Sequence, residues 1–142
     1  MMGIGSLNYV PILAAAIASF VFGGIWYSAL SKPWMDAVGM SPERMRRDRG
    51  SFGLYVLAFV AQLVMAVMLA GILVHLALGG FPTTLRTGLI CAAFLWLGFV
   101  IPTMLVNYAF HGAKQMLTLI DGGHWLAVLL IQGAIMGWWG VR

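Results

Sequence analysis

The chain has 142 residues, of which 62% are hydrophobic and 8% are charged. In ordinary soluble domains roughly 45–50% of the residues are apolar and about 25% are charged. A water-soluble domain of this size still exposes about a third of the surface of its unfolded chain, and eight basic plus four acidic residues cannot cover that area. The composition therefore predicts an integral membrane protein and excludes a secreted enzyme, a nucleic-acid-binding domain and a disordered linker.

Four apolar segments are long enough to cross a bilayer, whose hydrocarbon core of about 30 Å requires about 20 helical residues. They run over Asn8–Leu30, Phe52–Leu78, Arg86–Phe110 and Gly122–Val141. Apart from Arg86 at the edge of the third, they contain no charged residue. We predict an all-α integral membrane four-helix bundle, with residues 1–142 as one domain. The first segment lacks the basic start of a signal peptide, so we expect it to be retained.

The first connection, Ser31–Gly50, holds five of the eight basic residues, and Lys114 adds a sixth on the same side. By the positive-inside rule this side faces the cytoplasm and both termini face out. We therefore expect a multi-pass protein of the bacterial inner (plasma) membrane. Anionic lipid headgroups are expected to bind the arginines of this connection, which are Arg44, Arg46, Arg47 and Arg49.

Local patterns add detail at the cytoplasmic surface. Ser41-Pro42-Glu43 is typical of a helix start, with an N-cap, a proline and an acid in the first turn, and predicts a short interfacial helix to about Arg49. An aromatic belt at headgroup level is expected on this side, formed by Trp26, Tyr27, Trp34, Tyr55, Tyr108 and Trp125.

Several motifs resemble a family of small bacterial four-span membrane proteins known as domain of unknown function 1761. They include Asn8-Tyr9, the run from Gly23 to Ser28, the run from Lys32 to Met35, Trp96-Leu97-Gly98-Phe99, Asn107-Tyr108, Trp125-Leu126 and Gly133-Ala134-Ile135. The resemblance covers nearly the whole chain. It implies a four-span membrane protein and brings no assigned activity, cofactor or catalytic residue with it.

Polar residues inside the spans are the places where a function would reside, because they are costly in lipid without partners. Ser19, Gln62 and Gln132 lie at similar depths and predict one polar layer. Its role is either hydrogen-bonded helix packing or a neutral constriction and binding layer. Small residues at Gly133 and Gly137 predict close helix contact, either inside the chain or between copies.

Pro102 predicts a kink in the third span, because it removes an amide donor and displaces the carbonyl of Gly98. Asn107 lies where it can satisfy loosened backbone groups or contact water. The kink is either a static packing feature or a gating hinge.

At the cytoplasmic end, His111, Asp121 and His124 form a weak candidate for a proton or divalent cation site. The alternative is that the histidines are interfacial and that Asp121 caps the fourth helix. We expect all four acidic residues to lie in connections. No phosphate loop, zinc motif, nucleophile elbow or cysteine pair is present in the sequence, so we expect neither enzyme activity nor a cofactor.

Two function classes follow. The first is a structural or interaction role, as a homo-oligomer or as an accessory subunit of a membrane complex. The second is a small oligomeric transporter or channel for an uncharged or weakly charged solute. We expect the first, because no charge inside the spans is available for ion coupling.

Overall fold

The computed structural model describes residues 7–48 and 51–142. Over these residues the chain is helical and has no strands. Four helical segments are long and apolar enough to cross a membrane: α1 (Tyr9–Ala29), α4 (Phe52–Leu78), the run Leu85–Phe110, and α7 (Gln115–Trp139). The predicted all-α bundle of membrane helices is therefore confirmed.

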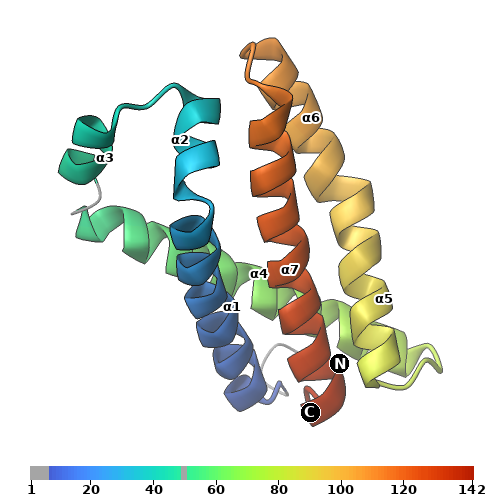
Figure 1. Ribbon diagram of the computed structural model, residues 1–142. Helices are drawn as coiled ribbons and strands as arrows, with labels where there is room; N and C mark the ends of the chain where they lie inside the picture. Colours follow the sequence, from blue (N-terminus) through green and yellow to red (C-terminus); the bar gives the residue numbers. More distant parts are fainter. Residues whose placement is uncertain (1–6, 49–50) are drawn as a thin grey trace.

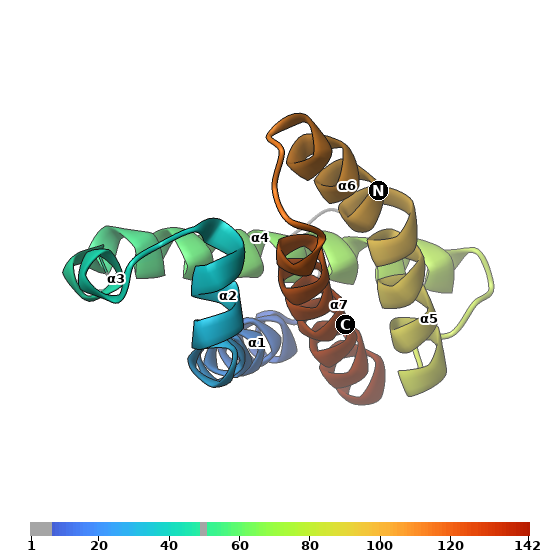
Figure 2. The ribbon, with the colours of Figure 1, turned by 45° about the horizontal axis from the view of Figure 1, so that its top comes forward.

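Helix α7 lies at the centre of the bundle. It packs against α1 on one side and against α5 (Leu85–Leu95) on the other, while α4 crosses behind at a steep inclination (Figures 1 and 2). Over an apolar 18-residue stretch of α7, 44% of the residues are buried, whereas over such a stretch of the Leu85–Phe110 segment only 6% are buried. The amide of Asn8 donates to the carbonyl of Val141 at 3.0 Å, so the start of the described chain and its C-terminal end lie together. A functional site inside this protein is therefore most expected on α7 and on the residues that pack against it.

Helices α1 and α4 meet through small side chains. Ala15 and Ala16 of α1 and Ala66 and Ala70 of α4 have no exposed surface and belong to one apolar cluster. Such side chains let helix backbones approach, and in lipid the resulting van der Waals contact is a main source of association.

Glycines make an even closer contact between α5 and α7. A Cβ added at Gly133 would collide with the carbonyl oxygen of Gly88, and one at Gly137 with that of Thr84. Gly133 and Gly137 were predicted to make close helix contact either inside the chain or between copies, and the contact observed is inside the chain.

The Leu85–Phe110 segment is interrupted rather than simply kinked. Between α5 and α6 (Ile101–Phe110) lies a π-helical turn, η2 (Trp96–Val100). Pro102 has no N–H to give the carbonyl of Gly98, and the amide of Ile101 bonds five residues back to Trp96. The distortion expected at Pro102 is present as this wider turn. Gly98 and Asn107 are both exposed, and the carbonyl of Asn107 accepts the amide of His111 at 3.1 Å.

The first connection contains two helices instead of the one that was predicted. Helix α2 (Ser31–Val38) follows α1 after a turn at Leu30 and ends at Gly39, whose φ of +72° favours glycine. The local pattern did not reveal α2, because Lys32-Pro33 and Asp36 interrupt its apolar positions.

A short helix at the predicted position is confirmed as α3 (Pro42–Asp48), and Ser41 Oγ accepts the amide of Arg44 at 3.2 Å. Its three arginines, Arg44, Arg46 and Arg47, are exposed. Exposed ion pairs join Arg44 to Asp48 at 3.7 Å and Arg46 to Glu43 at 3.8 Å, and pairs of this kind stabilise little. Arg49 lies outside the described residues.

The predicted start of the fourth span at Gly122 was wrong. Helix α7 begins at Gln115, and Asp121 is its seventh residue. Apolar residues before Asp121 continue the helix, and the aspartate is 9% exposed inside it. The expectation that all four acids lie in connections therefore fails at Asp121, as does the idea that it caps the helix; the other three lie in α2 and α3.

Candidate functional site

The carboxyl group of Asp121 accepts three hydrogen bonds from aromatic side chains. Tyr27 donates its hydroxyl to Oδ1 at 2.8 Å, and Trp34 donates its indole N–H to the same oxygen at 3.2 Å. Tyr108 donates its hydroxyl to Oδ2 at 2.7 Å. These four residues, from α7, α1, α2 and α6, are called the Asp121 site below. One buried carboxyl group thus joins four helices.

Two further indoles hold the backbone on either side of this carboxyl group. Trp26 donates to the carbonyl of Ile120 at 3.1 Å, and Trp96 donates to the carbonyl of Gly122 at 2.8 Å. Trp96 belongs to the π turn, so the distorted part of the third span supports the Asp121 site.

The two glycines after Asp121 allow the neighbouring helices to approach. A Cβ at Gly122 would lie 2.9 Å from Ile101 Cδ1, and one at Gly123 would lie 3.1 Å from Trp26 Cζ2. The Asp-Gly-Gly sequence, which looks like a helix start, is instead the point of closest packing around the carboxyl group.

The Asp121 site contains no basic side chain. Among the described residues, the ion pairs are those of α3, and Lys114 donates to the backbone carbonyl of Asp36 at 2.8 Å. An ionised carboxylate here is held by neutral donors alone, and a buried charge without a counter-charge is costly. The three hydrogen bonds donated to the carboxyl group offset part of this cost.

His124 lies on α7, one turn after Asp121, and is 4% exposed. Its ring lies against the ring of Tyr27, with 4.8 Å between centroids, and against that of Trp125, also at 4.8 Å. Tyr27 therefore contacts both Asp121, through its hydroxyl group, and His124, through its ring.

The residues of the predicted polar layer are brought together by hydrogen bonds from one side chain, that of Gln132. Gln132 donates its amide N–H groups to Ser19 Oγ at 3.1 Å and to the backbone carbonyl of Gln62 at 3.0 Å. All three residues are buried. These residues, called the glutamine layer below, lie at the meeting of α1, α4 and α7. Both proposed roles of the layer, helix packing and a neutral constriction or binding layer, stay predictions.

The structure does not form the three-residue cation site that combined His111 with Asp121 and His124. His111 follows α6, is exposed, and bonds its Nδ1 to the carbonyl of Asn107 at 2.7 Å. Over residues 7–48 and 51–142, no group of three or more His, Cys, Asp or Glu side chains is arranged to hold a metal ion. Asp121 and His124 stay close together, while His111 points elsewhere.

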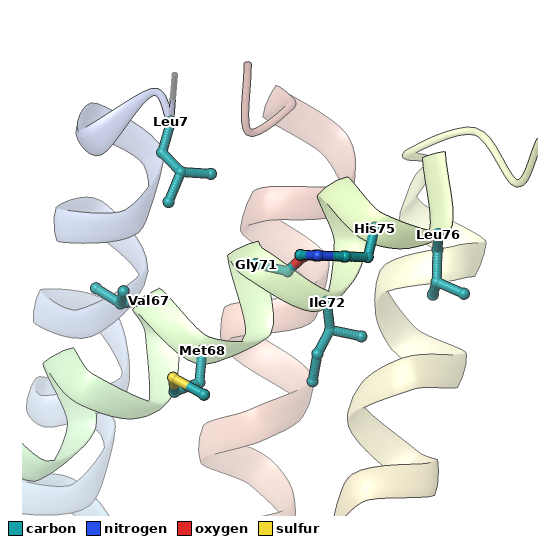
Figure 3. Close-up of a pocket in the computed structure, with 7 residues that line it drawn as sticks. All are labelled: Leu7, Val67, Met68, Gly71, Ile72, His75 and Leu76. Atoms are coloured by element: carbon teal, nitrogen blue, oxygen red, sulfur yellow. The ribbon is translucent and has the colours of Figure 1, made fainter. Parts of the chain in front are cut away.

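A groove of about 480 Å³ lies away from the Asp121 site, between Leu7 and the C-terminal part of α4 (Figure 3). Its lining is apolar except for His75, whose Nδ1 already bonds the carbonyl of Gly71 at 2.8 Å. The groove has the character of a surface that faces lipid acyl chains.

Four of the aromatic residues assigned to a headgroup belt make hydrogen bonds within the protein. Trp26, Tyr27, Trp34 and Tyr108 donate hydrogen bonds to Asp121 or to its neighbouring backbone. The sequence did hold a signal for the position of Asp121. The largely apolar run Met116–Ile120 lies upstream of it, which places the acid within a helix rather than before one.

Comparison with known proteins identifies the family and no more. A family model described as "Protein of unknown function (DUF1761)" matches residues 10–137. No curated protein and no solved structure matches the chain. The chain belongs to the DUF1761 family, as its motifs predicted.

Proposed function

We propose that this member of the DUF1761 family is a small proton-coupled membrane transporter in which Asp121 is the group that binds the proton. The single observation that carries the proposal is a carboxyl group, 9% exposed, inside a membrane-spanning helix and held by neutral donors. An ionisable residue at such a position commonly marks a substrate, ion or proton pathway.

The proposal reverses the order of the two function classes expected from the sequence. An interaction role came first because no charge inside the spans was available for coupling. Asp121 lies roughly 9 Å along α7 from its first residue. It therefore supplies the coupling group whose expected absence had argued against transport.

Orientation is part of the same proposal. Six of the eight basic residues lie on the side where α7 begins, and the positive-inside rule places that side in the cytoplasm of a bacterial cell. Asp121 then exchanges its proton with the cytoplasmic side of the inner membrane. The exposed arginines of α3 would lie against anionic lipid headgroups there, each contributing about 1 kcal/mol.

The test is a pH jump applied to the reconstituted protein on a solid-supported membrane. The wild-type protein should give a transient current when protons bind, and Asp121→Asn should abolish it while keeping one acceptor oxygen for the aromatic donors. Asp36→Asn is the matched control, because Asp36 on helix α2 is exposed, and it should keep the current. A transient of wild-type size in correctly folded Asp121→Asn protein contradicts the proposal.

A second candidate is the structural role, with a second copy of the chain as partner. It is favoured by the start of α4, where residues 52–57 are exposed on every side of the helix in the part of the chain that is described. Cysteine cross-linking in membranes tests it, in a Cys91→Ala background. Leu57→Cys should cross-link between copies if this surface is an interface, whereas Phe99→Cys on η2 should not; the absence of any Leu57→Cys product excludes such a dimer.

A further inference from the structure

Three buried side-chain atoms near the centre of the bundle have no hydrogen-bond partner among the described residues. They are Nδ1 of His124, Oε1 of Gln62 and Oε1 of Gln132. The three side chains are 4%, 3% and 0% exposed, so bulk solvent does not reach them. Buried polar atoms in proteins are nearly always paired with protein atoms or ordered water.

The orientation of the Gln132 amide is determined by its contacts. One of its two partners, the backbone carbonyl of Gln62, can only accept a hydrogen bond, so the atom facing it is Nε2. Ser19 Oγ donates to the carbonyl of Ala16 and so accepts from the same Nε2. The Gln132 carbonyl oxygen is therefore the atom left over, and an amide flip does not supply a partner for it.

Gly23 brings the other two side chains to one place. A Cβ at this position would lie 2.8 Å from His124 Nε2 and 3.8 Å from Gln62 Nε2. The imidazole lies against the rings of Phe22, Tyr27 and Trp125. The Nε2 atoms of His124 and Gln62 therefore both face Gly23, and the backbone carbonyl of Gln62 accepts from the Gln132 side chain in the glutamine layer.

We propose that water binds between His124 and the glutamine layer and completes the hydrogen bonds of these three atoms. A buried water makes about three hydrogen bonds and can donate to amide oxygens while it donates to or accepts from an imidazole nitrogen. The two amide oxygens accept no hydrogen bond from the described residues, so water, which can donate to both, fits the chemistry of this site.

This water extends the polar line of α7 from the Asp121 site into the membrane. Asp121 and Gln132 lie roughly 16 Å apart along the helix axis. Tyr27 and His124 occupy the first part of that interval. The idea that this water carries protons between Asp121 and the bilayer centre rests on the proposed function. The binding of water at this site does not depend on it.

Radiolytic footprinting with ¹⁸O-labelled water tests the site directly in the reconstituted protein. Hydroxyl radicals formed from internal water modify adjacent side chains, so His124 and Phe22 should take up label. Met136, which has no exposed surface and lies in the apolar core, is the internal reference and should stay unlabelled despite the high reactivity of methionine. Labelling of His124 no greater than that of buried apolar side chains overturns the proposal.

Two neighbouring glycines provide matched variants. Gly23→Ala places a methyl group 2.8 Å from His124 Nε2, which forces the imidazole to shift, and should lower labelling of His124, whereas Gly24→Ala meets nothing within 4 Å and should leave it unchanged. Equal labelling in the two variants contradicts the site. Absence of water together with an Asp121-dependent pH-jump current ends this inference but keeps the proposed function, and the converse result keeps only the water site.

Discussion

The two halves of α7 are held by different physical means. The first half is surrounded by aromatic donors that bond to Asp121 and to the carbonyls beside it. The second half has Gly133 and Gly137 in backbone contact with α5. Direct backbone contact leaves no room for a larger side chain in the second half, whereas side-chain hydrogen bonds hold the first half. We call the first half, held by hydrogen bonds, the polar half, and the second, held by backbone packing, the glycine half.

The largest effect is expected in the glycine half. Gly133→Ala places a methyl group onto the carbonyl of Gly88, which is backbone and cannot turn aside. Helices α5 and α7 must separate, so we expect a loss of about 3 kcal/mol in unfolding free energy. Thermal unfolding in mild detergent measures it. Gly71→Ala is the control, because a Cβ there meets nothing within 4 Å. Similar stability of the two variants would contradict the claim that backbone contact holds the second half of α7.

Removal of the carboxyl group comes next. Asp121→Ala leaves Tyr27, Trp34 and Tyr108 without their acceptor, and buried unpaired donors cost about 1–3 kcal/mol. Relief of the cost of burying a charge offsets part of this, so we expect a net loss of about 2 kcal/mol. Asp121→Asn should recover much of the stability and none of the proton binding. An asparagine variant as unstable as the alanine variant shows that charge, rather than an acceptor, holds the helices.

The glutamine layer gives a smaller and asymmetric effect. Gln132→Leu removes two hydrogen bonds and should cost about 1 kcal/mol, within the range measured for polar contacts between helices in lipid. Gln62→Leu should cost less, because Gln62 contributes its backbone carbonyl to the layer and its side-chain oxygen has no described partner. Chemical denaturation of the two variants side by side checks the order, and the reverse order refutes it.

The smallest change in stability is expected at Pro102. Pro102→Ala restores an amide that can bond the carbonyl of Gly98, so the π turn should become regular helix and its amides should exchange more slowly with solvent. Trp96 would then shift relative to Gly122, which loosens the polar half alone. Hydrogen-exchange mass spectrometry over residues 96–101 reports both, with Pro82→Ala as the control in a connection. Exchange unchanged from the control excludes a role for Pro102 in the turn.

The sequence predicted the fold well because lipid imposes long apolar segments that are readable one by one. The second span was predicted to the residue at both ends, and the interfacial helix began at the proline that marks its start. Family membership followed from motifs spread along the chain.

The site was harder to predict because it depends on partners distant in sequence. Asp121 bonds to Tyr27 across 94 positions and to Trp34 across 87. Local reading of Asp121-Gly122-Gly123 favours a cap, since a carboxyl group within a span is unfavourable until its donors are known. The glutamine layer was easier, because depth alone aligns Ser19, Gln62 and Gln132.

Infrared spectroscopy of the reconstituted protein tests the central claim, that Asp121 binds a proton inside the membrane-spanning helices. In difference spectra between acidic and alkaline pH, the wild-type protein should show the carbonyl band of a protonated carboxylic acid in apolar surroundings. Asp121→Asn should lack that band, while Asp36→Asn keeps it. An identical band in Asp121→Asn protein, or no such band in the wild-type protein at any pH at which it stays folded, contradicts the account.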